Sequence, residues 1–583
     1  MALWQTSLIW AVYAIVVTIL FMVASVFIYV YQTPRNRSLS VTLVCIVAII
    51  CLLATVLLLP VDVALVSSTV SFSKGRRKDW ATQEVVDSIT HSLTVVYYIL
   101  YSVDILLCLL IIPFTYFWYE EYDEVAAQEG EQSIGQRFWG ASKHTLSFVA
   151  ILVILFSVGF FMPISKANDG GGLEFFKNLI GGNHVERALI FALGLLISVG
   201  MCVYVLHTSI GFAVLPIRLI KGGPSLSTKG LIATSSVQLE SNRERQRQLE
   251  GRCRGNSGLL SSKDRRELDA LAREERTLIR RQRLAQEAEG GSQTFLMGVW
   301  FKLEAFFRPF KLLWGLILMA VALLTWVSML LTATDKAKNS ICKHHCGYIL
   351  GHINIFNPIN QIFVQSAKVF PVDYVLFTVL VLLFFCSSVV GITTVGIRFL
   401  WINIFQVRKG HTPPQAILLM TGILILGILA LNYSISMVVA PQYATFGPQT
   451  FCDRAPDLSE MQPDCSKTSH LIIPCSEAIN SRATEQVCIP SIASTFLNRV
   501  SINFPFFGAV FFWAQFAFLG IYLLALIVSF LRSPKIDERQ LDEDAENAEE
   551  EALLARSRRN AGAQWQNVIG RASRRDDVRR EGD

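Results

Sequence analysis

This sequence has little charge, no phosphate-binding motif and no sign of a cleavable leader. Only 17% of its 583 residues are charged, and a formal net charge of +6 is small for that length, which argues against a nucleic-acid binder. No G-x-x-x-x-G-K-[ST] segment occurs, so the sequence gives no sign of ATP hydrolysis through a phosphate loop. Met1–Thr6 contains no Lys or Arg, and the apolar run behind it is longer than the roughly 7–15 residues of a signal peptide. We therefore expect an uncleaved membrane anchor, and we expect no catalytic residue, no cofactor and no resident metal.

Long hydrophobic stretches dominate what is present, and 52% of the residues are hydrophobic. A helix needs about 20 apolar residues to cross a hydrocarbon core about 30 Å thick. Nine stretches meet or approach that length: Leu8–Tyr31, Leu39–Leu65, Leu93–Phe117, Leu146–Pro163, Arg187–His207, Leu312–Leu331, Tyr374–Val395, Ala416–Val438 and Phe506–Leu531. The sequence therefore predicts an all-α, polytopic membrane protein with nine transmembrane helices.

The cysteines indicate an orientation for these helices. Half of the 12 cysteines fall in two loops, after the sixth and the eighth stretch, and two spans separate those loops, so they share one side of the membrane. An even number of loop cysteines is typical of disulfides in an oxidising lumen, with free or metal-binding thiols as the alternative. We therefore expect a lumenal N-terminus and a cytosolic C-terminus. The disulfide candidates are Cys342, Cys346, Cys452, Cys465, Cys475 and Cys488.

The same pattern divides the chain into six segments. Residues 1–220 hold five spans, 221–300 form a charged helical loop in the cytosol, 301–437 hold spans six to eight with a short Cys-bearing lumenal loop, 438–504 form a lumenal cap stapled by disulfides, 505–531 form the ninth span, and 532–583 form a disordered cytosolic tail. Leucines recur at near-helical spacing among Arg and Glu in the charged loop, which predicts an amphipathic helix paired in a hairpin with Val237–Leu249. This loop either docks a partner or is a solvated helix beneath the membrane.

Three polar residues in the apolar stretches are candidates for a substrate path. Asp104 lies in the middle of the third stretch, and a carboxylate at that depth normally faces a cavity or a partner. A substrate-path or proton-coupling role and a structural hydrogen bond are both open for it. Asp62 is nearer the end of its span and fits an interfacial position, and His207 closes the fifth stretch, so a structural role is favoured for both. An intramembrane aspartyl protease is disfavoured because no glycine-rich context surrounds either aspartate.

The tail contains one address-like motif. Glu549 lies four residues before the pair Leu553 and Leu554, as in acidic dileucine signals that adaptors read on the cytosolic tails of endosomal and lysosomal cargo. Such a short match also arises by chance in a Glu-rich helix, so a functional signal and a coincidence both stay open.

Several segments together resemble a known family. The matching segments are Leu58–Val63, Tyr98–Asp104, Ile112–Glu121, Gly396–Arg398, Val407–Ala416 and Ala440–Tyr443. They are similar to the lysosomal cobalamin transporters, a group within the limb-region-like membrane proteins that include the lipocalin-interacting receptor. The likeness extends from the first stretch to the ninth and is weakest in the charged loop and the tail.

The resemblance implies nine spans, a lysosomal or vacuolar membrane, and export of cobalamin (vitamin B12) from lumen to cytosol. It implies an ABC transporter of the peroxisomal-type subfamily and a cytosolic cobalamin-processing protein as partners. Membrane lipid and a second copy of the chain are further candidate partners, independent of the resemblance. Because the family has no established catalytic residues, none is carried over. The chain would act as a carrier or as a partner of the ATP-driven transporter. The alternative is an endocytic receptor or membrane scaffold for a lipocalin-like or other protein ligand.

Overall fold

The computed structural model describes most of the chain from Ala2 to Leu531. The residues it leaves undescribed are 1, 34–36, 123–128, 130–131, 162–183, 222–227, 254–265, 277, 280–281, 283–294, 341–347, 349–355, 370, 400–401, 408–411, 454–464, 466–467, 478–486 and 532–583. The chain divides into two units, Met1–Arg218 with Trp314–Leu531, and Leu219–Leu313 with Arg532–Asp583.

Helices of membrane-spanning length build the first unit. Among the described residues, eight helical stretches are long and apolar enough to cross a bilayer: Thr6–Tyr31, Leu39–Ser67, Gln83–Glu120, Ile190–Lys221, Phe310–Asn339, Val372–Val395, Pro414–Val439 and Pro505–Leu531. Each overlaps one of the nine predicted stretches. A mostly helical, polytopic architecture is therefore confirmed, while the count of nine is not settled by these eight.

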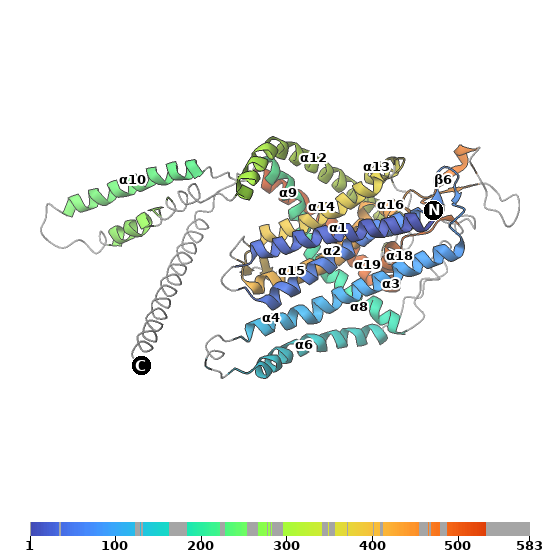
Figure 1. Ribbon diagram of the computed structural model, residues 1–583, viewed down its shortest axis with the longest axis horizontal. Coiled ribbons are helices and arrows are strands. Elements are labelled where there is room, and N and C mark those ends of the chain that lie inside the picture. Colours follow the sequence, from blue (N-terminus) through green and yellow to red (C-terminus); the bar gives the residue numbers. More distant parts are fainter. Residues whose placement is uncertain are drawn as a thin grey trace, which may run out of the picture. The chain divides into compact units, whose positions relative to one another are not determined.

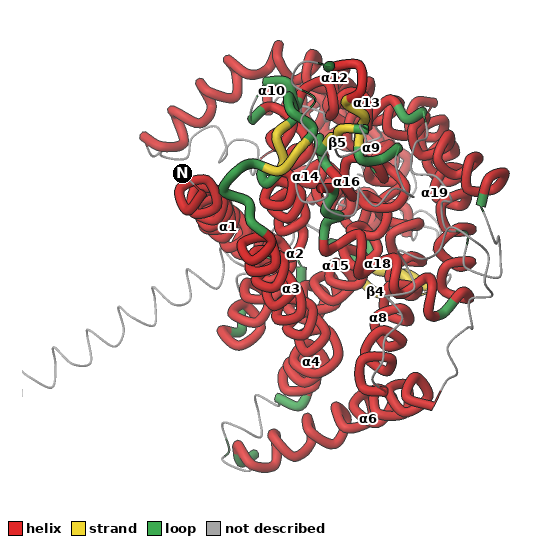
Figure 2. Tube along the Cα trace, turned by 90° about the vertical axis from the view of Figure 1, so that its right-hand side faces the viewer, coloured by secondary structure: helices red, strands yellow, loops and turns green. Residues whose placement is uncertain are grey.

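The predicted fourth span corresponds to α6 (Ile134–Phe161), a helix of 28 residues. It contacts α4 (Ile112–Glu120) and α8 (His184–Val203), and Figure 2 shows it at the outer edge of the bundle. It is not one of the eight helical stretches that are long and apolar enough to cross a bilayer, a number that covers the described residues only. The ninth span therefore stays a prediction.

Two helices form the centre of the first unit. α2 (Leu39–Ser67) contacts α1 (Ala2–Tyr31), α3 (Gln83–Leu106), α14 (Val372–Val395) and α15 (Pro414–Ser434). α15 also packs against α8, and its side chains are mostly buried. In contrast, α1 and α19 (Pro505–Leu531) expose many large apolar side chains. An apolar helix that stays exposed is expected to face lipid, so the outer surface of this unit suits a bilayer.

Three spans change locally from α- to π-helical geometry. The π-helical segments are η1 (Leu107–Ile111) between α3 and α4, η2 (Tyr204–Thr208) between α8 and α9 (Ser209–Lys221), and η4 (Ile435–Val439) after α15. The first begins three residues after Asp104, and the second contains His207. Short π-helical segments inside α-helices frequently occur at functional sites, which makes the surroundings of Asp104 and His207 candidate sites.

Short elements gather at the end of the bundle where the chain begins, and we call them the cap (Figure 1). They are α13 (Pro358–Ser366), α16 (Pro441–Phe446), α18 (Ile492–Asn503), η5 (Ser469–Leu471), and the strands β1 (Val70–Ser71), β2 (Arg76–Arg77), β5 (Thr450–Cys452) and β6 (Ile472–Pro474). β1 pairs with β2, and β5 with β6, both antiparallel. Gly75 turns between β1 and β2 with φ +63°, and its carbonyl accepts a 2.9 Å hydrogen bond from the Cys452 amide. A side chain at Gly75 would meet that backbone, so only glycine permits this approach.

A further hairpin, β3 (Ile397–Phe399) with β4 (Ile402–Phe405), follows α14. The second unit contains α10 (Thr228–Cys253), a helical segment at 266–276 and the start of α12 (Phe295–Asn339). Arg243 Nε donates a 2.8 Å hydrogen bond to Glu275 Oε1, and Gln246 Nε2 donates to the other oxygen at 3.2 Å. These bonds lower the pKa of the Glu275 carboxyl. α10 and the 266–276 segment therefore contact each other, as the predicted hairpin requires.

Candidate functional site

One face of α3 carries a tyrosine pair and a carboxylate. Tyr97, Tyr101 and Asp104 are spaced by four and three residues, so they share one side of the helix. All three are at most 5% exposed, although Ile99 on the opposite side of α3 is 56% exposed. The polar face therefore points into the bundle, toward α2.

Asp104 is held by a hydroxyl of the neighbouring helix. Thr55 Oγ1 on α2 donates to Asp104 Oδ2 at 2.7 Å, and Asp104 is 2% exposed. Asp104 Oδ1 has no hydrogen-bond partner among the described residues. A buried carboxyl with one oxygen unsatisfied is costly, which marks Asp104 as a candidate for binding something that passes through the bundle.

Asp62 is covered by the cap and does not face an interface with water. It is 0% exposed, and its Oδ2 accepts a 2.9 Å hydrogen bond from the Ala493 amide in the first turn of α18. The amides at a helix N-terminus carry partial positive charge and favour an anion there. Ser491 caps the same turn by accepting from the Ser494 amide. α18 therefore folds over Asp62 and supplies the donor that water would otherwise supply, while the interfacial depth of Asp62 stays a prediction.

The two tyrosines of α3 connect the two carboxyls. Tyr97 interacts electrostatically with Asp62, and Tyr101 interacts with both Asp62 and Asp104. The Tyr97 hydroxyl and Asp62 are close enough to interact, but neither that hydroxyl nor Asp62 Oδ1 makes a hydrogen bond of ordinary length and angle within the described residues. We call Thr55, Asp62, Tyr97, Tyr101 and Asp104 the carboxylate cluster.

A recess lies beside this cluster, between α3 and α18. Its volume is about 160 Å³, and Tyr97 and Tyr101 line it together with Phe496 of α18. The two tyrosines therefore have one side toward the recess and another toward the carboxyls.

The sequence predicted that His207 closes the fifth span. In the structure it lies inside a continuous helix. The helix continues through η2 and α9 to Lys221. The carbonyl of His207 lies so close to Gly391 of α14 that a side chain at Gly391 would fall on it, and Gly211 meets the carbonyl of Ser387 in the same way. We call His207, Gly211, Ser387 and Gly391 the glycine seam. Small residues permit such backbone approach between membrane helices, so His207 belongs to a tightly packed contact.

The His207 ring and its neighbours support that interpretation. Its Nδ1 lies 3.2 Å from the carbonyl of Val203 in its own helix, and the ring also interacts with the backbone of Gly396. The next residue, Thr208, shares a 2.8 Å hydrogen bond with Ser388 of α14. Thr208 therefore pairs with the adjacent helix, whereas His207 Nε2 is buried without a hydrogen-bond partner among the described residues.

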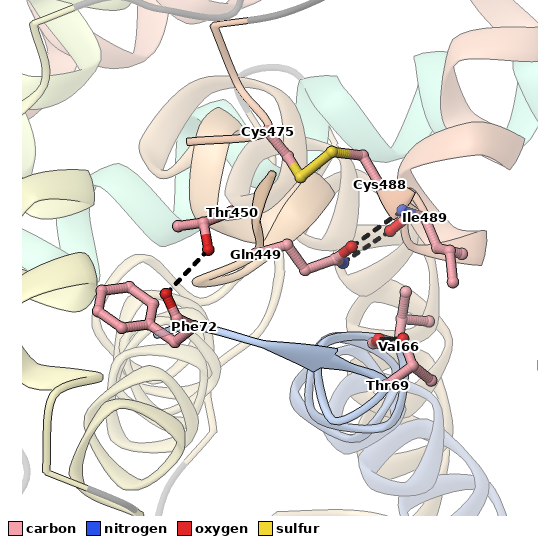
Figure 3. The surroundings of a disulfide bond; sticks show 8 residues. All are labelled: Val66, Thr69, Phe72, Gln449, Thr450, Cys475, Cys488 and Ile489. Atoms are coloured by element: carbon pink, nitrogen blue, oxygen red, sulfur yellow. Dashed lines mark hydrogen bonds between the residues drawn. A yellow bond between two sulfur atoms is a disulfide. The ribbon is translucent and has the colours of Figure 1, made fainter. Parts of the chain in front are cut away.

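The four described candidate cysteines form two disulfides in the cap. Cys452 bonds Cys465 and Cys475 bonds Cys488, each pair separated by 13 residues. Figure 3 shows the second bond beside Gln449, whose side-chain amide exchanges two hydrogen bonds with the backbone of Ile489, at 2.8 and 2.9 Å. Cys342 and Cys346 lie outside the described residues, as do Glu549, Leu553 and Leu554.

Sequence reasoning missed further buried polar residues near the cap. Asp373 accepts a 2.8 Å hydrogen bond from the Tyr443 hydroxyl. The pKa of Tyr443 is raised mainly by burial and, to a smaller extent, by the nearby Asp373 carboxylate. Asn357 caps α13 and donates to the carbonyl of Val439 at 2.9 Å. Lys336 is 4% exposed, with its ammonium 6.0 Å from the centre of the Tyr433 ring. Lys336 was missed because the predicted span ended at Leu331, which assigned Lys336 to a loop. In the structure α12 continues to Asn339.

No metal centre is evident where the structure has described side chains, since no group of three or more His, Cys, Asp or Glu converges there.

What these helices define is a polytopic membrane protein whose core holds buried carboxyls next to an aromatic recess. The chain belongs to the LMBR1-like membrane proteins, whose family pattern matches residues 9–288.

Curated relatives cover the whole chain. A protein of Emericella nidulans is 72% identical over 99% of this chain and all of its own length, and one of Aspergillus oryzae is 68% identical over the full length of both. A relative from Sclerotinia sclerotiorum is 56% identical over 98% of this chain and 96% of its own. All three are named "Probable lysosomal cobalamin transporter". The predicted resemblance is thereby confirmed, and no solved structure matches the chain.

Proposed function

We propose that this protein exports cobalamin from the lumen of the lysosome or vacuole to the cytosol. The observation that carries the proposal is the full-length identity of 72% and 68% to relatives named as lysosomal cobalamin transporters. The matched length of each relative includes the cap, the bundle and the charged loop. A multi-pass membrane protein with buried polar groups is consistent with such a role.

In the carrier version of this proposal, the carboxylate cluster contacts the cargo. The corrin ring of cobalamin is fringed with carboxamide groups, whose N–H donors match carboxylate oxygens. Asp104 Oδ1 and Asp62 Oδ1 are oxygens without a hydrogen-bond partner among the described residues, and both lie in the bundle interior. Asp104 is the stronger candidate, because Asp62 is already engaged by the N-terminus of α18.

The size of the recess constrains that version. Even drug-sized ligands occupy pockets of about 300–1,000 Å³, and cobalamin is larger than most drugs, so a hollow of about 160 Å³ does not hold it whole. A carrier would have to open between α3 and α18 to pass its cargo. The described arrangement is then a closed state.

In the second version the chain assists an ABC transporter of the peroxisomal-type subfamily and hands cobalamin to a cytosolic processing protein. The absence of a phosphate loop from the sequence leaves the energy source to such a partner. The hairpin of α10 with the 266–276 segment, rich in Arg and Glu, offers a charged docking surface.

Reconstitution separates the two versions. The purified full-length chain would be placed in liposomes, and the movement of radiolabelled cobalamin across the bilayer measured with and without a co-reconstituted ABC partner. Flux by the chain alone supports the carrier. Flux only with the partner and ATP supports the assisting role, and no effect of the chain under either condition would contradict the proposed function.

Nine spans with a lumenal N-terminus and cap complete the proposal. The disulfides of the cap support this orientation, because disulfides persist in an oxidising compartment. Protease protection of tags at the N-terminus and after Leu531, in sealed vesicles, tests it. Tags on the same side would mean an even number of spans.

Delivery to the lysosome or vacuole is proposed to use the acidic dileucine of the tail. Replacing Leu553 and Leu554 by Ala should divert the protein to other membranes, which fluorescence microscopy of a tagged chain would detect. Unchanged localisation would show that the motif is incidental.

A further inference from the structure

The recess between α3 and α18 has aromatic walls in a defined arrangement. The rings of Tyr97 and Tyr101 are stacked, with centroids 5.7 Å apart and planes 22° apart. Tyr101 stacks in turn on Phe496 of α18, at 5.5 Å and 19°. Tyr98 meets Phe496 edge-on at 6.3 Å and 86°. Such walls favour a flat aromatic group, which can stack on a face or meet an edge.

A cation lies on the same wall. Among the described residues that line the recess, Arg499 is the one charged side chain. It is three residues beyond Phe496 on α18, so both residues lie on one face of that helix. A guanidinium group presents a planar fork of donors that suits phosphate oxygens. The recess therefore combines stacking surface with a phosphate-binding charge about one helical turn away.

The recess has room for a small ring system. A cavity of about 150 Å³ holds a benzene ring, so about 160 Å³ that opens to the surface admits the edge of a fused bicyclic ring. Tyr98 at its mouth is 39% exposed, so the opening is reachable from outside the bundle. A corrin macrocycle is too wide to enter.

We propose that this recess binds the nucleotide end of cobalamin, its dimethylbenzimidazole base and the phosphodiester beside it. The inference rests on the proposed function and names the part of the cargo that is recognised. Cobalamin has one benzene-fused base and one phosphodiester, and they are neighbours at this end, whereas the corrin carries neutral amides. With the base inserted, the corrin would stay outside the mouth of the recess, beside Tyr98.

Competition binding tests the proposal. The full-length chain in phosphatidylcholine nanodiscs would be incubated with radiolabelled cobalamin and two competitors. One is the free dimethylbenzimidazole ribotide, which has the base and phosphate only, and the other is cobinamide, which has the corrin without the nucleotide. The ribotide should displace the label, and cobinamide should compete at least tenfold more weakly than cobalamin.

Variants at the mouth of the recess assign the binding to it. Tyr98→Ala should weaken cobalamin binding about tenfold, within the range of one stacked base, and Tyr98→Phe should restore it. Phe506→Ala is the matched control, because Phe506 is a 72% exposed ring on α19 outside the recess. Arg499→Gln should weaken binding of the ribotide but not of the same riboside without phosphate.

Several results would overturn the inference. Equal competition by cobinamide, or unchanged affinity in Tyr98→Ala, would reject the recess while cobalamin binding by the wild type upheld the proposed function. Loss of ribotide competition in nanodiscs containing phosphatidylglycerol would assign the recess to lipid phosphate instead. If the wild-type chain bound no cobalamin, either alone or with its ABC partner, both the proposed function and the recess as its binding site would be rejected.

Discussion

The carboxylate cluster and the glycine seam both bury polar groups among apolar helices, but they differ in how closely the surrounding helices pack. In the glycine seam, α14 and the helix of His207 approach until a single added carbon would collide with backbone. In the carboxylate cluster, Asp62 and Asp104 each leave one oxygen without a partner among the described residues, beside a recess.

The difference separates a structural contact from a candidate path. Apolar side chains are as well solvated by lipid as by another helix, so the hydrophobic effect does not drive membrane helices together. Close packing therefore gives a membrane helix pair much of its stability. Unsatisfied carboxyls contribute no such stability, so their presence calls for another role. We therefore expect substitutions in the glycine seam to damage folding and substitutions of Asp104 to damage transport.

Substitution of Gly391 should have the largest effect on stability. In Gly391→Ala the new carbon falls on the His207 carbonyl, so the two helices must separate, at a cost of about 3 kcal/mol in the free energy of unfolding. Reversible unfolding in detergent would measure the loss. Gly520→Ala is the control, because no atom lies within 4 Å of a carbon added there. Equal stability of the two variants would show that the seam is not tightly packed.

Substitution of Asp62 should have the next effect, and it tests whether the cluster also contains a structural member. Asp62→Ala leaves the buried Ala493 amide without its acceptor, which costs about 2 kcal/mol. Asp62→Asn keeps an acceptor and should lose less. The same unfolding measurement applies, with the exposed Asp79→Ala as control. If Asp62→Ala and Asp62→Asn lost equal stability, the hydrogen bond between Asp62 of α2 and the Ala493 amide of α18 would not contribute to folding.

Substitution of Thr55 should have a smaller effect on stability. Thr55→Val keeps the shape of the side chain but removes the hydroxyl that binds Asp104, for a loss of about 1 kcal/mol. Thr18→Val is the matched control, because Thr18 is exposed and bonds only within its own helix. A loss no larger than that of the control would mean that the Thr55–Asp104 hydrogen bond does not contribute to folding.

Much of this architecture is predictable from sequence, because hydropathy alone determines which segments can cross a bilayer. The mid-span position of Asp104 and the cysteine-rich cap were visible in the same way. The burial of Asp62 was not, since it depends on α18, which is 430 residues later in the chain and has an unremarkable local pattern. The extent of helices also escaped prediction: the apolar runs end before Lys336 and at His207, but in both places the helix continues.

Pairing between distant segments was equally out of reach. The recess needs Tyr101 and Phe496 to stack, and no local periodicity brings α3 to α18. The same holds for the glycine seam, where Gly391 looks like an ordinary small residue until His207 is placed against it. Sequence patterns thus identified the polar residues, and the tertiary contacts distinguish their roles.

The most direct test of this distinction is cobalamin flux by Asp104→Asn, reconstituted in parallel with the wild type and with the ABC partner if the wild type requires it. Asn keeps an acceptor for Thr55, so unfolding should be unchanged within about 1 kcal/mol. The account predicts that flux falls at least tenfold while the protein stays folded. Wild-type flux by Asp104→Asn would contradict it, because the buried carboxyl would then have no part in moving the cargo.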